Sequence, residues 1–428
     1  MFRLVHVIQV VIKYGLDEYL TRYEQARFFN SAGIFLRKLF SINNTDPIEI
    51  RLKMALQELG PVFIKFGQIA STRRDLMPSA VADELAKLKD SVPPVSGVSI
   101  KAIIEEGLGR PIDSIFSDFS FDPIAAASVA QVHQAKLLTG EDVVVKVLRP
   151  NIESIIKEDL AMFRDIIMSL QFFKNNLRFF NALGVVEELE ISILQELDLE
   201  LEAINADRFR YNLKDIPTVR VPKMYKEFST KQILVMEHMY GTPIDHIDTL
   251  TNKDIDLKDI ARRGVEILIL QIFRDRFFHA DQHSGNVWIT DSGDSVFLDF
   301  GIMGSLSKED RDIAARLMVS LFTKNYAEFV EVQIQAGWLS DSADKDAVRK
   351  SFQNINGLLL KGSLALAFRR LLSLGETHGI KVPVQFTLLV KTLIAVEGVA
   401  KTIDPTFDIS RIGTPIFIKH FSKYLKTK

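Results

Sequence analysis

The fold of this chain is decided by Phe277-Phe278-His279-Ala280-Asp281-Gln282-His283-Ser284-Gly285-Asn286. This polar loop lies between the apolar run at 264–278 and the apolar triplet at 287–289. Soon afterwards, Val296-Phe297-Leu298-Asp299-Phe300-Gly301 is a β-branched and aromatic segment that ends on an acid followed by Phe-Gly. An Asp, an Asn after four intervening residues and a second Asp beyond a hairpin are the arrangement of a phosphotransfer centre.

Each of these three residues has an expected role. Asp281 would orient or deprotonate the attacking hydroxyl, and Asn286 and Asp299 would hold Mg²⁺ against the phosphates. Hard oxygen ligands suit Mg²⁺, which takes only one or two protein groups beside phosphate and water. Taken alone, a polar loop of His, Asp, Asn and Gly is common. The order of the residues, with a turn signal at 291–294 between two strands, favours the catalytic interpretation.

Bulk composition narrows the classes of protein. The chain has 428 residues, which suits two or three packed units, and its 47% hydrophobic and 25% charged residues are globular in character. A net charge of −2 gives no argument for a nucleic-acid partner. The absence of cysteine excludes disulfides, zinc–thiolate sites and cysteine nucleophiles.

The first residues form an apolar segment, Phe2–Ile12, in which Arg3, His6 and Gln9 recur every third position. This is a helix with a narrow polar stripe, and it is shorter than the roughly 20 residues that cross a bilayer. It is either a helix packed on its own protein or an interfacial helix lying on a membrane. No segment of the sequence has the character of a transmembrane span.

A predicted helix at 62–78 carries the most unusual lysine. Lys65, Gln68 and Thr72 share one face of it, and apolar residues surround the lysine. The alternatives are a solvent-facing polar stripe and a buried, functional lysine. Further helices are predicted N-terminal to residue 118, at positions 47–59, 79–90 and 99–108, with two more in residues 1–45.

A β-hairpin is predicted from residue 129 to residue 148, and its second strand carries Lys146. In a kinase-like small lobe this is the place of the lysine that binds the α- and β-phosphates. The loop before it is Ala125-Ala126-Ala127-Ser128, which keeps small side chains but lacks glycine's freedom at positive φ. We expect a stiffer loop that offers fewer backbone N–H groups to phosphate.

Acidic partners for the two lysines lie on a predicted helix at 185–212, as Glu196, Asp198 and Glu202, although a plain charged surface is the alternative. Helices at 152–170 and 172–183 are interpreted as insertions. The remaining expectations are strands at 219–222 and 232–236, a lobe hinge at 236–241, helices at 254–278, 307–322, 326–337, 342–376 and 384–402, and a basic tail from Arg411 that is frayed or touches a membrane surface.

Together these motifs resemble the UbiB/ADCK/AarF family of atypical kinases over about residues 20–410. The most specific element is the KxGQ signature around Lys65-Phe66-Gly67-Gln68, followed by Ser71 to Leu76. The alanine-rich loop, the ExD element Glu196-Leu197-Asp198 and the two motifs first described accompany it. Glu397-Gly398-Val399-Ala400 and Asp404-Pro405 also match the family's C-terminal pattern.

The resemblance implies an α+β, bilobal protein-kinase-like fold with an N-terminal helical extension and inserted helices. Its parts would be a KxGQ extension at 1–118, a small lobe at 119–239 and a helical large lobe at 240–428. Lys146 would pair with Glu202, and Asp281 would be the catalytic acid/base. Lys65 and Gln68 would face the acids Glu196 and Asp198 and regulate access. Nucleotide would also be bound by the loop residues Ile124, Ala125, Ala126, Ala127, Ser128, Val129, Ala130, Gln131 and Val132.

The function implied by the resemblance is an atypical kinase or ATPase that uses ATP or ADP with Mg²⁺ and supports ubiquinone (coenzyme Q) biosynthesis. It would lie peripherally on the cytoplasmic face of the bacterial inner membrane, with quinone-pathway enzymes and a lipid or quinone precursor as partners. Ser284 departs from the family's usual Pro, and the hydrophobic C-terminal anchor of bacterial relatives is not found before Lys428. That departure implies either no stable insertion or a longer chain. Two alternatives remain: a weakly catalytic pseudokinase scaffold and a small-molecule kinase.

Overall fold

The computed structural model describes residues 2–16, 46–72, 78–85, 87–88, 95–173, 189–190, 193–359 and 378–421. The chain divides into two compact units, 1–201 with 225–237 and 202–224 with 238–428. One division, between Glu237 and His238, falls in the segment that the sequence predicts as a lobe hinge. The three-part division at 118 and 239 stays a prediction.

The first unit contains an antiparallel sheet in the order β1-β3-β4-β6, with β2 paired to β3. Its strands are β1 (Phe116–Phe119), β2 (Ala125–Ala126), β3 (Ala130–Leu137), β4 (Asp142–Leu148) and β6 (Ile233–Glu237). Valines at 143, 145 and 147 alternate along β4 and point into one core. The predicted hairpin that carries Lys146 is therefore confirmed.

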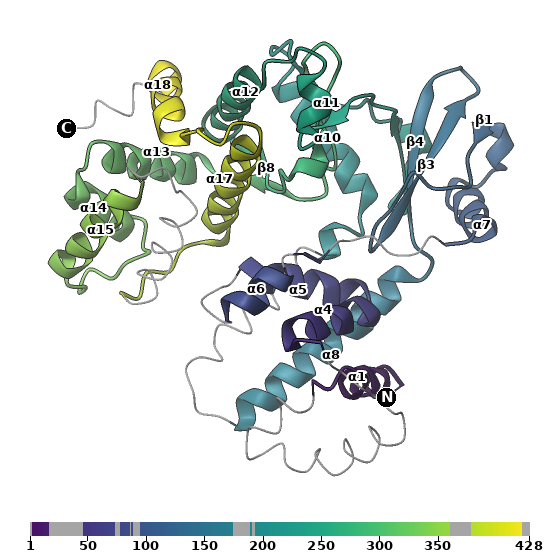
Figure 1. Ribbon diagram of the computed structural model, residues 1–428, viewed down its shortest axis with the longest axis horizontal. Coiled ribbons are helices and arrows are strands. Elements are labelled where there is room, and N and C mark those ends of the chain that lie inside the picture. Colours follow the sequence, from purple (N-terminus) through teal and green to yellow (C-terminus); the bar gives the residue numbers. More distant parts are fainter. Residues whose placement is uncertain are drawn as a thin grey trace. The chain divides into compact units, whose positions relative to one another are not determined.

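One face of this sheet is covered by helix α7 (Gly97–Leu108), which lies beside β1 (Figure 1). Ile100 and Ile104 are fully buried against Val143 and Val145. A short 3₁₀ turn, Ile112–Ser114, leads from the helix into β1, and a second, Lys226–Phe228, precedes β6. The sheet and α7 thereby enclose a small hydrophobic core, and the alanine-rich loop lies next to it, before β3.

The N-terminal helices of this unit pack on one another and on α8 (Ile152–Phe173). They are α1 (Phe2–Lys13), α4 (Ile48–Leu59), α5 (Pro61–Thr72) and α6 (Ser79–Leu85). Gly67 lets α5 approach its neighbours, because a Cβ there would collide with the side chains of Leu56 and Leu88. Helices are present where the sequence predicts them at 47–59, 79–90 and 99–108, with different end points. Residues 73–77, 86 and 89–94 lie outside the described residues.

Helix α1 packs on its own protein, which is one of the two interpretations of its sequence, and the membrane interpretation stays a prediction. Arg3 donates from Nε and Nη2 to the carboxylate of the buried Asp159 at 2.6 and 2.8 Å and also to the Leu59 carbonyl at 2.6 Å. These bonds fasten the helix to its own protein. On another face Leu4, Val5 and Ile8 stay exposed, which is the pattern of a helix that meets something apolar.

Two predictions about the helices between residues 152 and 212 are wrong. A single helix, α8, runs through residues 170–172, where a break was expected, and residues 174–188 lie outside the described part. The helix expected at 185–212 is interrupted, because Glu196 and Leu197 form a turn and α10 spans only Leu199–Asn212. Asp198 caps α10 instead, and its Oδ1 accepts from the Leu201 N–H at 2.9 Å.

The second unit begins within α10 and contains two small sheets. One has the order β5-β10-β9-β7, from β5 (Val219–Arg220), β7 (Thr242–Pro243), β9 (Val287–Ile289) and β10 (Ser295–Phe297). The other pairs β8 (Phe277–His279) with β11 (Met303–Ser305). Only the β5–β10 contact is parallel among the described pairings.

The helix predicted at 254–278 ends earlier than expected. Helix α12 (Leu257–Leu270) starts at Asp256, which accepts from the Asp259 N–H, and a π-helical turn follows at Gln271–Asp275. Arg276 then takes a left-handed φ of 55°, and Phe277 and Phe278 enter strand β8. A buried aromatic pair suits a strand and a helix alike, so the apolar run alone could not place this boundary.

The remaining helices are α11 (Ile247–Thr251), α13 (Lys308–Phe322), α14 (Tyr326–Gln335), α15 (Lys345–Leu359), α17 (Val384–Ile403) and α18 (Ile409–Phe421). The prediction of a frayed tail from Arg411 is wrong as far as Phe421. Phe417 and Phe421 are buried in α18 and pack on Phe273. Residues 360–377 and 422–428 lie outside the described part. Across the described residues, no helix is both long and apolar enough to cross a bilayer.

Candidate active site

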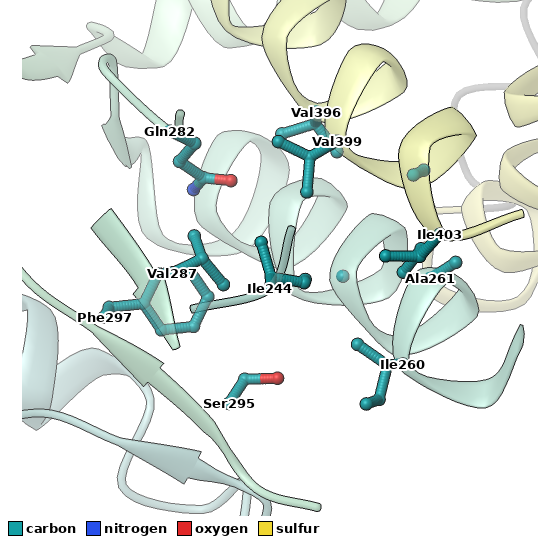
Figure 2. Close-up of a pocket in the computed structure, with 12 residues that line it drawn as sticks. Ile244, Ile260, Ala261, Gln282, Val287, Ser295, Phe297, Val396, Val399 and Ile403 are labelled. Atoms are coloured by element: carbon teal, nitrogen blue, oxygen red, sulfur yellow. The ribbon is translucent and has the colours of Figure 1, made fainter. Parts of the chain in front are cut away.

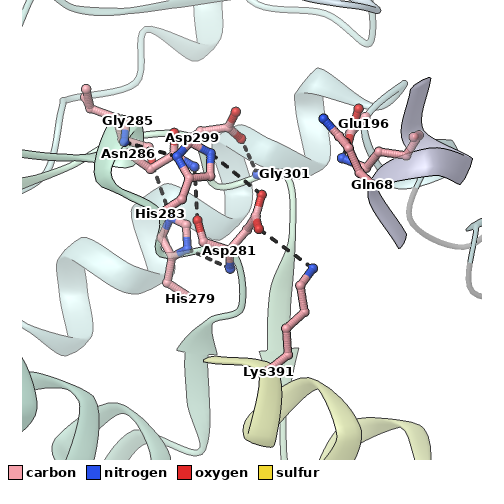
Figure 3. Close-up of polar contacts among 12 residues, drawn as sticks. Gln68, Glu196, His279, Asp281, His283, Gly285, Asn286, Asp299, Gly301 and Lys391 are labelled. Carbon is pink, nitrogen blue, oxygen red and sulfur yellow. Dashed lines mark hydrogen bonds and ion pairs between the residues drawn. The ribbon is translucent and has the colours of Figure 1, made fainter. Parts of the chain in front are cut away.

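The catalytic loop and the Asp-Phe-Gly motif are joined in the second unit by the ends of its small sheets (Figure 3). His279 on β8 pairs with Met303 on β11, just after the motif, and β9 pairs with β10, just before it. The backbone then closes the gap, because the Leu298 N–H donates to the Asn286 carbonyl at 2.9 Å. The loop that carries Asp281 and Asn286 is therefore hydrogen-bonded to Leu298, the residue directly before Asp299.

The His279 ring bridges the catalytic loop and the segment that precedes Asp299. Its Nε2 donates to the Leu298 carbonyl at 3.0 Å, and its Nδ1 accepts from the Asp281 N–H at 3.3 Å. The ring is fully buried, and burial lowers the pKa of His279 below its ordinary value. A neutral imidazole with one donor and one acceptor fits both bonds. His279 thus connects the loop to the segment that precedes Asp299.

The side-chain amide of Asn286 is held by the backbone of the catalytic loop. Its Nδ2 donates to the backbone carbonyl of Asp281 at 3.1 Å, and the side chain is almost buried (Figure 3). Because the amide nitrogen is engaged, the remaining polar atom is Oδ1, an oxygen ligand of the kind that Mg²⁺ prefers. The predicted role of Asn286 as a metal ligand stays a prediction, and this orientation of its amide is compatible with it.

Asp299 has a strained backbone, with a left-handed φ of 56°. Its Oδ1 accepts from the Gly301 N–H at 3.2 Å, and a Cβ at Gly301 would press against that oxygen. Non-glycine residues in this region cost free energy and concentrate at functional sites. Among the described residues, no group of three His, Cys, Asp or Glu side chains could hold a metal. Asn286 and Asp299 alone suit a metal that takes its other ligands from phosphate and water.

Asp281 has two neighbouring side-chain nitrogens, which the sequence did not reveal. Lys391 Nζ on α17 lies 3.8 Å from one carboxylate oxygen, and His283 Nε2 lies 4.0 Å from the other. Figure 3 shows the Lys391 side chain reaching toward Asp281. Lys391 was missed because one lysine on an amphipathic helix carries no local signal.

Helix α10 supplies two further residues that the sequence did not single out. Asn205 Nδ2 donates to the Phe300 carbonyl at 3.0 Å, which holds the backbone of the Asp-Phe-Gly motif. Phe209 packs its ring against Phe297, Phe300 and His279. A signal existed, since both residues lie on one face of a helix already expected to carry functional acids.

The KxGQ lysine lies in the first unit. Lys65 donates to Glu196, and both side chains are largely buried. Gln68 donates to the Leu88 carbonyl at 3.3 Å, while Asp198 lies 4.0 Å from Lys231. The contact between Lys65 and the ExD acids that the resemblance implies is thus present for Glu196, and the regulatory role stays a prediction.

Lys146 lies in the middle of β4, opposite Val132 on β3 and Leu234 on β6. Glu202 is buried and belongs to the second unit, so the predicted Lys146–Glu202 pair stays a prediction. Among the loop residues 124–132, Gln131 is fully buried, accepts from the Val95 N–H at 2.9 Å and contacts His133.

The alanine-rich loop is a tight turn. Ala127 N–H donates to the Ala130 carbonyl at 2.8 Å, and Arg149 Nε donates to the Ala127 carbonyl at 3.0 Å. None of its residues has a positive φ. The loop therefore uses only backbone conformations that alanine tolerates, as the sequence predicts.

A small apolar cavity lies under the catalytic loop (Figure 2). Its volume is about 40 Å³, so it is large enough for only two or three waters. Gln282 of the loop and Val287 of β9 line it together with Val396, Val399 and Ile403 of α17. Helix α17 therefore contacts the loop both through this cavity and through Lys391.

Comparison with known proteins agrees with this geometry. Residues 87–333 match the ABC1 atypical kinase-like domain, and residues 351–408 match the UbiB helical domain. The chain belongs to the UbiB family of atypical kinases. UbiB relatives described as probable protein kinases include one from Pseudomonas fluorescens, 37% identical over 100% of this chain and 82% of that protein. One from Actinobacillus pleuropneumoniae is 36% identical over 96% of this chain and 78% of its own length.

The fold is also similar to that of a solved structure, the complex of Rv3197 with erythromycin from Mycobacterium tuberculosis. It matches with a TM-score of 0.58 at 20% identity, over 95% of this chain and 100% of that one. At that identity the likeness concerns the fold alone. With the ABC1 match, it confirms the predicted α+β kinase-like fold, and a UbiB-type, kinase-like role follows from family membership. The UbiB helical domain contains α17, the source of Lys391.

Proposed function

We propose that this protein is an ATP- and Mg²⁺-dependent atypical kinase or ATPase that supports ubiquinone biosynthesis at a membrane. One observation carries the proposal: the Asp281 carbonyl engages the Asn286 amide nitrogen, while the Leu298 N–H ties Asn286 to the segment that ends on Asp299. A base, an amide oxygen and a carboxylate are thereby held by one backbone network, which is what phosphoryl transfer requires.

The residues divide the chemistry between them. Asp281 accepts the proton of the attacking hydroxyl or water, and its N–H is held by the neutral His279. Asn286 Oδ1 and Asp299 would bind Mg²⁺, which when bound neutralises charge on the phosphates. On the first unit, Lys146 is the predicted ligand of the α- and β-phosphates, and the alanine-rich loop is the predicted phosphate-covering loop.

The membrane and quinone parts of the proposal are supported by the sequence motifs and by helix α1. Support for ubiquinone synthesis comes from the resemblance of the sequence motifs, which implies that role. Peripheral contact with the cytoplasmic face of the inner membrane is supported by the exposed side chains of Leu4, Val5 and Ile8 on α1, which form a continuous apolar face. Quinone-pathway enzymes and a lipid or quinone precursor are the proposed partners.

A nucleotide-binding scaffold is the second candidate. The observation that favours it is the closed alanine-rich turn, in which the Ala127 N–H is already bonded to Ala130 and so is not offered to phosphate. A loop with fewer free donors would slow transfer without preventing nucleotide binding.

ATP hydrolysis decides between the two. Turnover is measured with Mg²⁺, with and without anionic liposomes and a phenol that resembles a quinone precursor. Asp281→Asn should abolish turnover and leave ATP binding nearly intact, whereas Asp299→Asn should weaken Mg²⁺-dependent binding. Nucleotide binding without turnover under every condition would favour the scaffold, and absence of both would overturn the proposal.

Membrane contact is tested separately by liposome flotation. The double variant Leu4→Ser/Ile8→Ser should float less than the wild type with anionic vesicles, because it removes apolar surface that would enter the interface. Val98→Ser is the matched control, since Val98 is 84% exposed but lies on α7. Equal loss in both variants would contradict a specific role for α1.

A further inference from the structure

The UbiB helical domain brings a positive charge to the catalytic loop. Lys391 lies in α17, and its Nζ is 3.8 Å from Oδ1 of Asp281 (Figure 3). The pair joins the C-terminal helical domain to the base of the proposed reaction. Both residues belong to the second unit.

The Lys391 ammonium still has donors to offer. The distance of 3.8 Å from Nζ to Asp281 makes an ion pair but is too long for a hydrogen bond. Within the described part of the chain, Lys391 donates no hydrogen bond to any other residue. Its side chain is 42% exposed and that of Asp281 is 32% exposed, so solvent or a ligand reaches the space beside them. A lysine carries three N–H donors, and all three are available to a third group.

The helix that carries Lys391 is firmly held. Helix α17 buries Leu389, Thr392, Val396, Ala400 and Ile403 along one face, and it packs on α12 and β11. The same helix lines the cavity below Gln282, the residue that follows Asp281. Because a buried seam fixes the backbone, the position of Lys391 is set before any ligand arrives, which is the condition for efficient electrostatic stabilisation.

The charges around the loop define what Lys391 would bind. Asp281 and Asp299 are acidic, and the proposed nucleotide adds phosphate charge that one Mg²⁺ offsets only in part. His283 approaches Asp281 on its other oxygen, and its Nδ1 already accepts from the Gly285 N–H at 3.1 Å. Lys391 is therefore the ammonium best placed to face a phosphoryl group next to the base.

We propose that Lys391 is a catalytic residue that binds the transferred phosphoryl group. This rests on the proposed function. In the transfer, the acceptor oxygen bonds to Pγ while the bond from Pγ to the β,γ-bridging oxygen breaks, and the bridging oxygen leaves on ADP with the electron pair. The acceptor proton goes to Asp281. Lys391 keeps its protons and donates hydrogen bonds to the γ-phosphoryl oxygens, on which charge is spread in the transition state.

The first test compares turnover of matched variants of the full chain. Lys391→Met should lower kcat for ATP hydrolysis by about 10²- to 10³-fold, the range for loss of one preorganised donor, and should change KM much less. Lys391→Arg should recover part of the rate because it keeps the charge. Lys419→Met is the control, since Lys419 also forms an ion pair of 3.8 Å, with Glu266, on the exposed side of α18.

The second test needs no turnover. ADP with aluminium fluoride mimics the transferred group, and its affinity for Lys391→Met should fall by about tenfold or more, as expected for loss of a charge-assisted hydrogen bond. The affinity for ADP alone should stay unchanged. A structural role would weaken both ligands or neither.

The outcomes separate this inference from the proposed function. If wild-type protein neither binds nor hydrolyses ATP, the proposed function fails. If the wild type hydrolyses ATP, and Lys391→Met retains both wild-type kcat and wild-type affinity for the fluoride complex, only the assignment of Lys391 is overturned. A rate that rises in Lys391→Met would also overturn it, because the lysine would then restrain Asp281 and not assist transfer.

Discussion

Asn205 on α10 donates its side-chain amide to the backbone carbonyl of Phe300 at 3.0 Å. The bond joins a helix to the middle of the Asp-Phe-Gly motif, 95 residues along the chain. Phe209, one turn further on the same helix, packs against the Phe300 ring at a centroid distance of 5.3 Å. Helix α10 therefore supports the strained backbone of Asp299 from one side.

Removal of the Asn205 amide should loosen this support. Asn205→Ala leaves the Phe300 carbonyl without its donor, which costs about 1–2 kcal/mol of stability. We expect a lower kcat and a higher Mg²⁺ concentration for half-maximal ATPase activity, because Asp299 is no longer held in its left-handed conformation. Ile204→Ala, at an exposed neighbour on the same helix, is the control. Equal Mg²⁺ dependence in both variants would show that the bond does not position the metal ligand.

Ala126→Gly should change nucleotide preference. The turn at Ala127–Ala130 has no positive φ, so glycine adds conformational freedom that the native loop does not use. A more mobile loop can turn more backbone N–H groups toward phosphate, and the ratio of ATP to ADP affinity should therefore rise. Isothermal titration with both nucleotides measures the ratio, and a ratio equal to that of the wild type would refute the prediction.

Burial of two histidines should make stability fall in mild acid. The pKa values of His279 and His133 are lowered, mainly by burial, from an ordinary 6.5. Between that value and the lower folded value, the unfolded chain binds more protons, so stability is lost as pH falls through this window and is regained as pH rises. The unfolding midpoint in urea should be lower at pH 5.5 than at pH 7.5.

His279→Gln separates the contribution of this residue. The variant should be less stable than the wild type at both pH values, because it loses the bonds to Leu298 and Asp281, yet it should lose less on acidification. His246→Gln, at an exposed position, is the control. If both variants lose as much as the wild type between pH 7.5 and 5.5, the buried imidazole of His279 is not the cause.

The polar loop at 277–286 and the Asp-Phe-Gly motif could be predicted because their chemistry is local. Turn residues, short β runs and the order of acids and amide are all visible within 25 positions, and the structure joins them as expected. The hairpin of Lys146 was equally clear, since the turn at Gly140-Glu141 is followed by a run of β-branched residues from Val143 to Val147. These are segments in which propensity and tertiary structure agree.

Sequence reasoning failed where a distant partner determines the local structure. Residues 195–198 have helical composition, yet Lys65 holds Glu196 in a turn and Asp198 caps the following helix. Residues Phe277 and Phe278 leave the helix because β11 pairs with them. Lys391 lies near Asp281 but belongs to the UbiB helical domain, more than 100 residues further along the chain. A single polar residue on a helix has no periodicity that could reveal this contact.

Two glycines in the second unit should respond oppositely to alanine. Gly264 lies inside α12 and lines the cavity, and a Cβ there meets no atom within 4 Å. Gly264→Ala should stabilise the protein by about 0.5–1 kcal/mol, because glycine is a poor helix former.

Gly304 pairs with Phe278, whose ring would collide with a Cβ. Gly304→Ala should destabilise by about 1–3 kcal/mol through overpacking. Denaturant midpoints for both variants test the pair, and a loss of stability for Gly264→Ala would contradict the open space.

The Lys65–Glu196 pair should couple strongly for an ion pair, because its side chains are only 12% and 19% exposed. Lys65→Met alone leaves a carboxylate with little solvent, and Glu196→Gln alone leaves an ammonium in the same position. A double-mutant cycle should therefore give a coupling free energy of about 1–3 kcal/mol. The Lys157–Glu153 pair on α8 is a matched control, at 2.6 Å with side chains 64% and 60% exposed. Its coupling should be much weaker, because water screens an ion pair that is exposed on a helix surface. Equal coupling in the two cycles would mean that water screens Lys65 as well, and the turn at Glu196 would then need another cause.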